Sequence, residues 1–210
     1  MLPAISRNAV LLAVFAVACT GAIAIINVMT QPIILEQQQI ALQNNINELI
    51  KPERYDNNII GSCFTVVDKT RLGDDTPKQV FIATKDNHPI AALIQTSTFK
   101  GYSGEIRLLV GIYKDGKVAG VRVNSHTETP GLGDKIQTNK SDWIFSFNGK
   151  EYQESAADKW EVKKNGGDFD AFTGATITPR AVVHAVEDVL IYFENHKKTL
   201  FNTPATCGGK

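Results

Sequence analysis

Two short segments hold the residues best suited to chemistry in this chain. The first reads Asp-Ala-Phe-Thr-Gly-Ala-Thr-Ile-Thr-Pro at residues 170–179 and directly precedes a stretch with helical apolar spacing. Thr178 is predicted to cap that helix, with Pro179 at its first position. Gly174 lets another group approach the backbone closely, and a helix N-terminus favours a phosphate. An ordinary capped helix after a turn explains the same residues.

The second segment reads His-Thr-Glu-Thr-Pro-Gly-Leu-Gly-Asp-Lys at residues 126–135. Pro130 with the glycines at 131 and 133 predicts a tight, rigid turn with exposed backbone N–H groups. Leu132 could cover an apolar surface, while Glu128 and Thr129 offer polar contacts. A plain loop after a strand is the alternative.

Both segments resemble signatures of one family. The spacing D-x-x-T-G-A-T at residues 170–176 is similar to the flavinylation motif of proteins that carry FMN through a phosphoester, and E-T-P-G-L-G at 128–133 is similar to a signature near the flavin ring. The resemblance implies that Thr176 holds the FMN phosphate and that a flavin transferase supplies FMN from FAD. Asp170 and Thr173 would be recognised by the transferase or orient the turn. Lys135 would contact the phosphate or ring edge, or is an exposed loop lysine. The implied cofactor-binding residues are Thr176, Thr173, Gly174, Ala175, Asp170, Glu128, Thr129, Gly131, Leu132 and Lys135.

Over its whole length the chain resembles the G subunit of the Rnf (Rsx) ion-translocating electron-transport complex. The resemblance implies a covalently flavinylated subunit that passes electrons between neighbouring redox subunits of a membrane-bound oxidoreductase. The C subunit of the Na⁺-translocating NADH:quinone reductase shares the anchor, domain and motif and is one alternative. A membrane-tethered periplasmic binding module without a redox group is another. A free-standing flavin reductase is disfavoured, since no nicotinamide-binding fingerprint appears.

The amino-acid composition argues against a nucleic-acid-binding protein, a metal site and a disulfide-rich scaffold. The 210 residues contain 22 Lys+Arg and 22 Asp+Glu, so no basic field favours a nucleic-acid partner. The four histidines are scattered, and no Cys/His pair has metal-ligand spacing, so no metal site is expected. Three cysteines are too few for a disulfide scaffold. Cys63 and Cys207 could pair, although their spacing is weak support for a bridge.

The N-terminal region predicts a membrane anchor. Residues 9–29 carry no formal charge, and about 20 helical residues match the ~30 Å hydrocarbon core of a bilayer. Arg7 is the one charged side chain before Glu36. The positive-inside bias therefore keeps residues 1–8 in the cytoplasm and sends the rest to the periplasmic side of a bacterial inner membrane. A lipoprotein signal at Cys19 and a cleaved signal peptide are the alternatives.

The remaining chain predicts an α+β fold, with a juxtamembrane helical stalk, mainly solvated, at residues 30–52, an FMN-binding domain at 53–200 and a flexible tail at 201–210. Period-two patterns predict antiparallel strands, and 3.6-residue spacing predicts a final helix flanking them. The predicted strands are 78–84, 90–96, 105–113 and 117–123, with weaker candidates at 143–147 and 160–163, and the helix covers 179–196.

Overall fold

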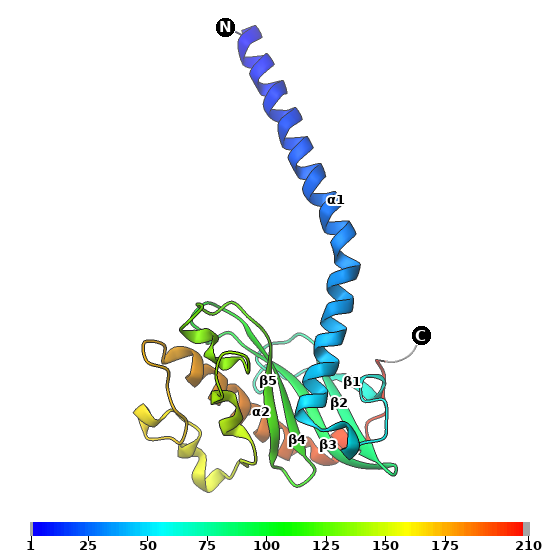
Figure 1. Cartoon of the computed structure of the whole chain (residues 1–210), viewed down its shortest axis with the longest axis vertical. Helices are drawn as coiled ribbons and strands as arrows, with labels where there is room; N and C mark the ends of the chain where they lie inside the picture. Colours follow the sequence, from blue (N-terminus) through cyan, green and yellow to red (C-terminus); the bar gives the residue numbers. More distant parts are fainter. Residues whose placement is uncertain (1, 208–210) are drawn as a thin grey trace. The chain divides into compact units, whose positions relative to one another are not determined.

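The computed structural model describes residues 2–207 and divides the chain into two units, residues 1–42 and residues 43–210. The first unit is purely helical and belongs to α1 (Leu2–Leu49). The second combines a sheet with a long helix and several short 3₁₀ turns, which confirms the predicted α+β class (Figure 1).

Helix α1 exposes its apolar side chains. Large residues between Val10 and Met29 are 62–73% exposed, and α1 is the one helix among the described residues that is long and apolar enough to cross a membrane. Apolar side chains this exposed are unfavourable in water and favourable in lipid. The predicted membrane segment 9–29 and most of the predicted stalk lie within this one helix, which ends at Leu49 before Pro52 starts a 3₁₀ turn.

Five antiparallel strands form a meander in the order β1-β2-β3-β4-β5. Their bounds are β1 (Cys63–Val66), β2 (Lys78–Lys85), β3 (His88–Thr98), β4 (Ile106–Tyr113) and β5 (Val118–His126). Asp86 and Asn87, both with positive φ, close the β2–β3 hairpin, and Gly116 at φ +100° closes the β4–β5 hairpin. Asp, Asn and Gly tolerate this left-handed geometry best.

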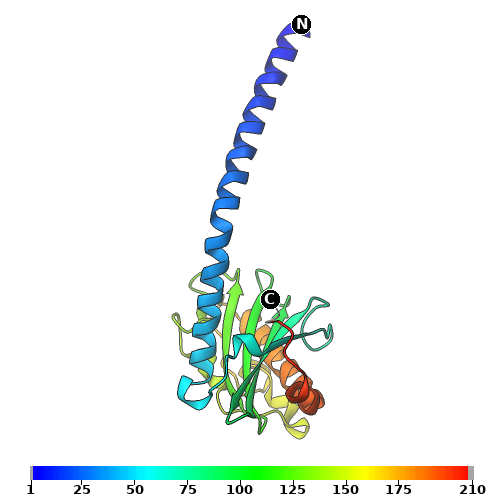
Figure 2. The ribbon, with the colours of Figure 1, turned by 90° about the vertical axis from the view of Figure 1, so that its right-hand side faces the viewer.

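Helix α2 (Ile177–Asn202) covers one face of the sheet (Figures 1 and 2). Alternate strand residues and the apolar stripe of α2 share one core. Strand residues of this core include Val80, Ile82, Ala92, Ile94, Leu108 and Val110, and helix residues include Val182, Val186, Leu190 and Phe193. Burial of this stripe fixes the rotation of α2 and therefore the direction in which its first turn points.

The last turns of α1 belong to the second unit and seat on the sheet. Leu49 is 4% exposed, and Gly111 and Gly120 are register partners directly beside it. A Cβ atom on Gly120 would lie 2.8 Å from Leu49 Cδ2, so a larger residue there would displace the Leu49 side chain. Glu48 also accepts a hydrogen bond from Arg122 Nε at 2.7 Å. The predicted solvated stalk is therefore packed against the domain at its C-terminal end.

Three predicted elements differ from the structure. Residues Trp143–Phe147 form a 3₁₀ helix, η4, because the buried Ile144 and Phe147 are three residues apart and share a face there. The candidate strand at 160–163 contributes one isolated bridge, Val162 to Phe169, because Trp160 packs into an aromatic cluster instead of a sheet. Helix α2 begins two residues before the predicted start and continues past the predicted end to bury Leu200.

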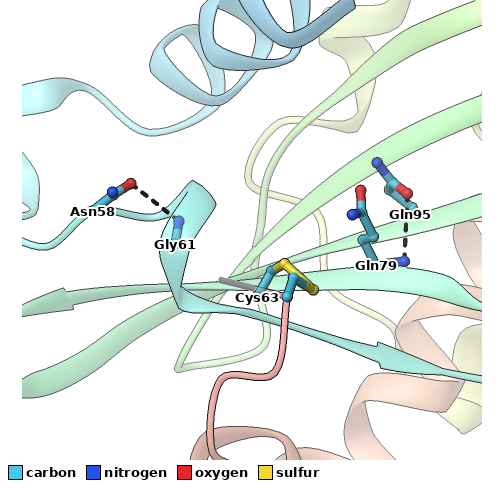
Figure 3. Close-up of a disulfide and its surroundings, with 6 residues drawn as sticks. Asn58, Gly61, Cys63, Gln79 and Gln95 are labelled. Carbon is cyan, nitrogen blue, oxygen red and sulfur yellow. Dashed lines mark hydrogen bonds between the residues drawn. A yellow bond between two sulfur atoms is a disulfide. The ribbon is translucent and has the colours of Figure 1, made fainter. Parts of the chain in front are cut away.

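A disulfide joins Cys63 on β1 to Cys207, with Cα atoms 5.3 Å apart (Figure 3). The backbone N–H groups of Thr206 and Cys207 also donate to the Cys63 carbonyl, at 2.7 and 3.0 Å. The described part of the predicted tail is thus held against β1, while residues 208–210 lie outside the described chain. The sequence had left this pairing open.

Candidate functional site

A pocket of about 280 Å³ opens at the N-terminal end of α2. This volume is close to the lower end of the ~300–1,000 Å³ range of small-molecule sites. Its lining comes from the β3–β4 loop, the turn after β5 and the segment that leads into α2. The lining residues are Tyr102, Glu128, Thr129, Leu132, Gly133, Gly174, Ala175, Thr176, Ile177 and Thr178.

Glu128 holds the three segments together. Its side chain is 4% exposed, and Oε1 accepts a hydrogen bond from the Ser103 backbone N–H at 3.0 Å. Oε2 accepts a hydrogen bond from the Thr178 hydroxyl at 2.5 Å. A Cβ atom on Gly101 or Gly133 would lie 2.7 Å from a Glu128 carboxylate oxygen, so both positions require glycine. The predicted polar contact of Glu128 is therefore made to the protein itself.

Backbone hydrogen bonds within the turn after β5 hold that turn closed. The N–H groups of Leu132 and Gly133 both donate to the Thr129 carbonyl at 3.1 Å. At Gly133 this corrects the expectation of an exposed backbone N–H group, because the N–H groups of Leu132 and Gly133 are hydrogen-bonded within the turn. Gly131 has φ +79°, a conformation that favours glycine. The Leu132 side chain is 42% exposed and forms the apolar wall of the pocket.

The segment before α2 presents Thr176 to the pocket. Thr176 is the N-cap of α2, yet its side chain makes no capping hydrogen bond. The predicted cap, Thr178, instead lies inside the first turn, is 1% exposed and is bonded to Glu128. The prediction of Thr178 as the helix cap is therefore wrong: Thr178 anchors the helix to the loop, and the N-cap position belongs to Thr176, which is half-buried and lines the cavity.

The predicted site residues separate into two groups. Those that line the pocket are Glu128, Thr129, Leu132, Gly174, Ala175 and Thr176, and those that do not are Asp170, Thr173, Gly131 and Lys135. Asp170 points outward and pairs with Lys163 at 2.7 Å, both largely exposed. Thr173 is exposed, and Lys135 lies on the 3₁₀ turn η3 (Gly133–Ile136).

Sequence reasoning missed several lining residues. Tyr102 and Ile177 are 69% and 46% exposed and add apolar surface to the pocket lining. Ile177 could have been found because it precedes, and does not fit, the buried stripe of the helix. Tyr102 carried no comparable signal beyond its place in a Gly-Tyr-Ser-Gly turn.

The pocket suits a ligand with one flat apolar part and one phosphate. Leu132, Tyr102 and Ile177 offer apolar surface at its mouth. Helix geometry leaves the N–H groups of Thr176, Ile177 and Thr178 without intrahelical acceptors, and the positive end of the helix dipole lies there. A phosphate on the Thr176 hydroxyl would be stabilised by both features. The lining residues therefore fit FMN.

Comparison with known proteins points the same way. A profile described as FMN-binding domain matches residues 101–191, and one described as RnfG N-terminal region matches residues 1–49. The G subunit of the ion-translocating oxidoreductase complex from Shewanella amazonensis is 46% identical over 207 residues, covering 99% of this chain and 96% of the relative. The corresponding proteins of Erwinia tasmaniensis and Vibrio cholerae are 47% and 44% identical, covering 99% and 100% of this chain and 98% and 100% of the relatives.

The chain belongs to the RnfG family. This decides between the two subunit types that the sequence left open, in favour of the G type. The FMN-binding match contains every residue that lines the pocket, from Tyr102 to Thr178. The RnfG N-terminal match ends at the residue where α1 ends.

Proposed function

We propose that this RnfG-family protein carries FMN covalently on Thr176 and passes electrons through it within a membrane-bound ion-translocating oxidoreductase. The observation that carries this proposal is the position of Thr176. Thr176 lines the pocket at the start of α2, and its hydroxyl is not used to cap the helix. The flavin supplies the redox chemistry, and the chain supplies its attachment, orientation and surroundings.

Attachment requires a phosphoryl donor, which we propose is FAD on a flavin transferase. A bond forms between Thr176 Oγ1 and the phosphorus on the riboflavin side of FAD. The phosphoanhydride bond breaks, AMP leaves, and the hydroxyl proton passes to the leaving phosphate or solvent. No net oxidation or reduction occurs. The product is a phosphodiester with one negative charge beside a helix N-terminus.

The other threonines of the segment are less suited to this role. Thr178 is 1% exposed and donates its hydroxyl proton to Glu128, so reaction there would break the bond that holds the pocket together. Thr173 is exposed but lies outside the pocket lining. Asp170 and Thr173 instead present an outward surface that the transferase would recognise.

The proposed partners are the other subunits of the complex and the transferase, and the proposed location is the bacterial inner membrane with the domain on the periplasmic side. One apolar helix and the position of Arg7 support this topology. The Cys63–Cys207 disulfide supports it independently, because disulfides persist in oxidising compartments such as the periplasm.

Intact-mass measurement tests the attachment. The full chain, produced with and without the transferase, should differ by one covalent FMN, and its denatured gel band should fluoresce only when the transferase is present. T176A should abolish the mass gain, and T176S should retain it. T199A, at an exposed threonine of α2 outside the pocket lining, is the matched control. Flavin mapped to Thr173 or Thr178, or an unmodified wild type in the presence of transferase and FAD, would overturn the proposal.

A further inference from the structure

We propose that Ser141 and Trp143 form a bracket that positions the flavin-attachment turn relative to the turn after β5. This inference rests on the proposed attachment at Thr176 and deepens it. Neither residue lines the pocket, so each would act as a positioning residue through the segments it holds.

Three hydrogen bonds connect the two turns. The Ser141 hydroxyl donates to the Lys135 carbonyl at 2.6 Å and accepts from the Trp143 backbone N–H at 3.2 Å. The Trp143 indole Nε1–H then donates to the Asp170 carbonyl at 2.7 Å. A continuous path therefore runs from the end of one sequence motif to the start of the other.

Ring contacts extend this path toward Thr176. The Trp143 ring meets Phe172 edge-on at 5.1 Å between centroids, and Phe172 is 8% exposed. The Phe172 carbonyl accepts the Ala175 N–H at 3.0 Å, which closes the turn directly before Thr176. Trp143 is thus fixed to two points of the attachment turn, one through its N–H group and one through its ring.

The side-chain ion pair at the start of this turn is weak by comparison. The Asp170 carboxylate pairs with Lys163, but both side chains are more than half exposed, and such pairs contribute little. Backbone hydrogen bonds hold the neighbouring Phe169, and the indole bond ties the Asp170 carbonyl itself to Trp143. The flavin would be attached to the turn at Thr176 while its ring lies against the turn at Leu132, so the two turns must keep a defined separation. A displacement of ~1 Å can lower the rate of a reaction that depends on positioning by about 10²-fold.

The decisive comparison is W143F against W160F in the full chain. Both substitutions trim one Trp of the same aromatic cluster, but Trp160 makes no hydrogen bond to residues 170–176 in the described part of the chain. With purified transferase and FAD, the rate of covalent loading is followed by gel fluorescence and intact mass, and the melting temperature of each variant is recorded. W143F should load at least about 10-fold more slowly than wild type. W160F, despite its buried position, should load at the wild-type rate below its melting temperature.

S141A tests the other half of the bracket and serves in place of W143F if that variant does not fold. S141A removes the hydrogen bond to the Lys135 carbonyl but keeps the bond from Trp143 to Asp170. The rate of covalent FMN loading should therefore stay at the wild-type value. The visible circular dichroism of the attached flavin should change, because the turn at Lys135 is less restrained. S146A, an exposed serine of η4, is its control. W143F loading at the W160F rate, or an S141A spectrum identical to that of S146A, would overturn the bracket. An unloaded wild type would instead overturn the proposed attachment itself.

Discussion

The Thr178 hydroxyl donates a hydrogen bond to Glu128 Oε2 across 50 residues of sequence. Both side chains are almost fully buried, at 1% and 4% exposure. The bond ties the first turn of α2 to the turn after β5, and the second Glu128 oxygen extends the tie to Ser103. The geometry of the pocket thus depends on one carboxylate that is itself inaccessible.

Replacing Thr178 with valine should expose this dependence. The valine side chain has a similar shape, but one oxygen of the buried Glu128 loses its donor, which costs about 1–3 kcal/mol. Urea unfolding of the detergent-solubilised chain measures the loss. T173V, at an exposed threonine of the same segment, should change the unfolding free energy by less than about 0.5 kcal/mol. Equal losses in both variants would contradict the assigned role.

Replacing Gly131 with valine should alter the flavin without preventing its attachment. The positive φ at Gly131 costs a residue with a side chain about 1–2 kcal/mol, and relief of that strain would shift Leu132 at the pocket wall. The absorption spectrum and midpoint potential should therefore move. G149V is a matched control, because Gly149 has φ +75° and equally open surroundings outside the pocket lining. An unchanged absorption spectrum and midpoint potential in G131V would count against a contact between the Leu132 turn and the flavin ring.

Glu187 should make the domain less stable as pH rises. Burial and the nearby Asp188 charge raise the pKa of Glu187 to about 7, against an ordinary value of 4.5, while Arg71 lowers it in part. The folded state therefore holds a proton that the unfolded state releases. The resulting stability is complete below pH ~4.5 and is lost as pH rises through ~7.

E187Q tests this pH dependence. At pH 8 the variant should be more stable than wild type by about 1 kcal/mol, after allowance for partial solvent exposure. The melting temperature measured from pH 4 to 8 should fall less steeply than in wild type. E194Q removes the same charge from an exposed position on α2 and should keep the wild-type slope. Parallel profiles for E187Q and wild type would refute the prediction.

A reporter fused after Lys210 should be active only if it functions in the periplasm. The expectation follows from Arg7 on the N-terminal side of one membrane-spanning helix. Alkaline phosphatase and a cytoplasm-only fluorescent protein make a suitable pair of reporters. Fluorescence from the cytoplasm-only protein would place the domain in the cytoplasm and contradict the prediction.

Four of the five strands were predictable because β2 to β5 carry local apolar alternation, whereas the four-residue β1 (Cys63–Val66) was not predicted. Alternating apolar residues and the Asp115-Gly116 turn define the β4–β5 hairpin, and its observed bounds differ from the predicted ones by only a few residues. The segment at Trp143 was wrongly predicted as a strand, because runs of aromatic and apolar residues occur both in strands and in short buried turns. Which structure forms there depends on packing against Phe147 and Phe172, and no local pattern encodes those contacts.

The site was predictable where a motif is contiguous and less so where distant residues meet. Thr176 and Leu132 were both expected at the flavin, and both line the pocket. That Thr178 bonds to Glu128 instead of capping the helix could not be predicted, because its partner lies 50 residues away in the sequence. Local preference favours Thr178 as a cap, and the buried Glu128 carboxylate outweighs that preference.

The Cys63–Cys207 disulfide closes most of the second unit into one covalent ring. The two cysteines are 144 residues apart, and the strands, the pocket segments and α2 all lie between them. A single protease nick anywhere in that interval would leave both fragments joined, so the domain would still migrate as one species on a non-reducing gel. For a nick before Thr176, only reduction would then separate the piece that contains Thr176 from the piece that contains α1 on a denaturing gel. A cut in a loop and separation of the Thr176 segment from α1 are therefore different events in this protein.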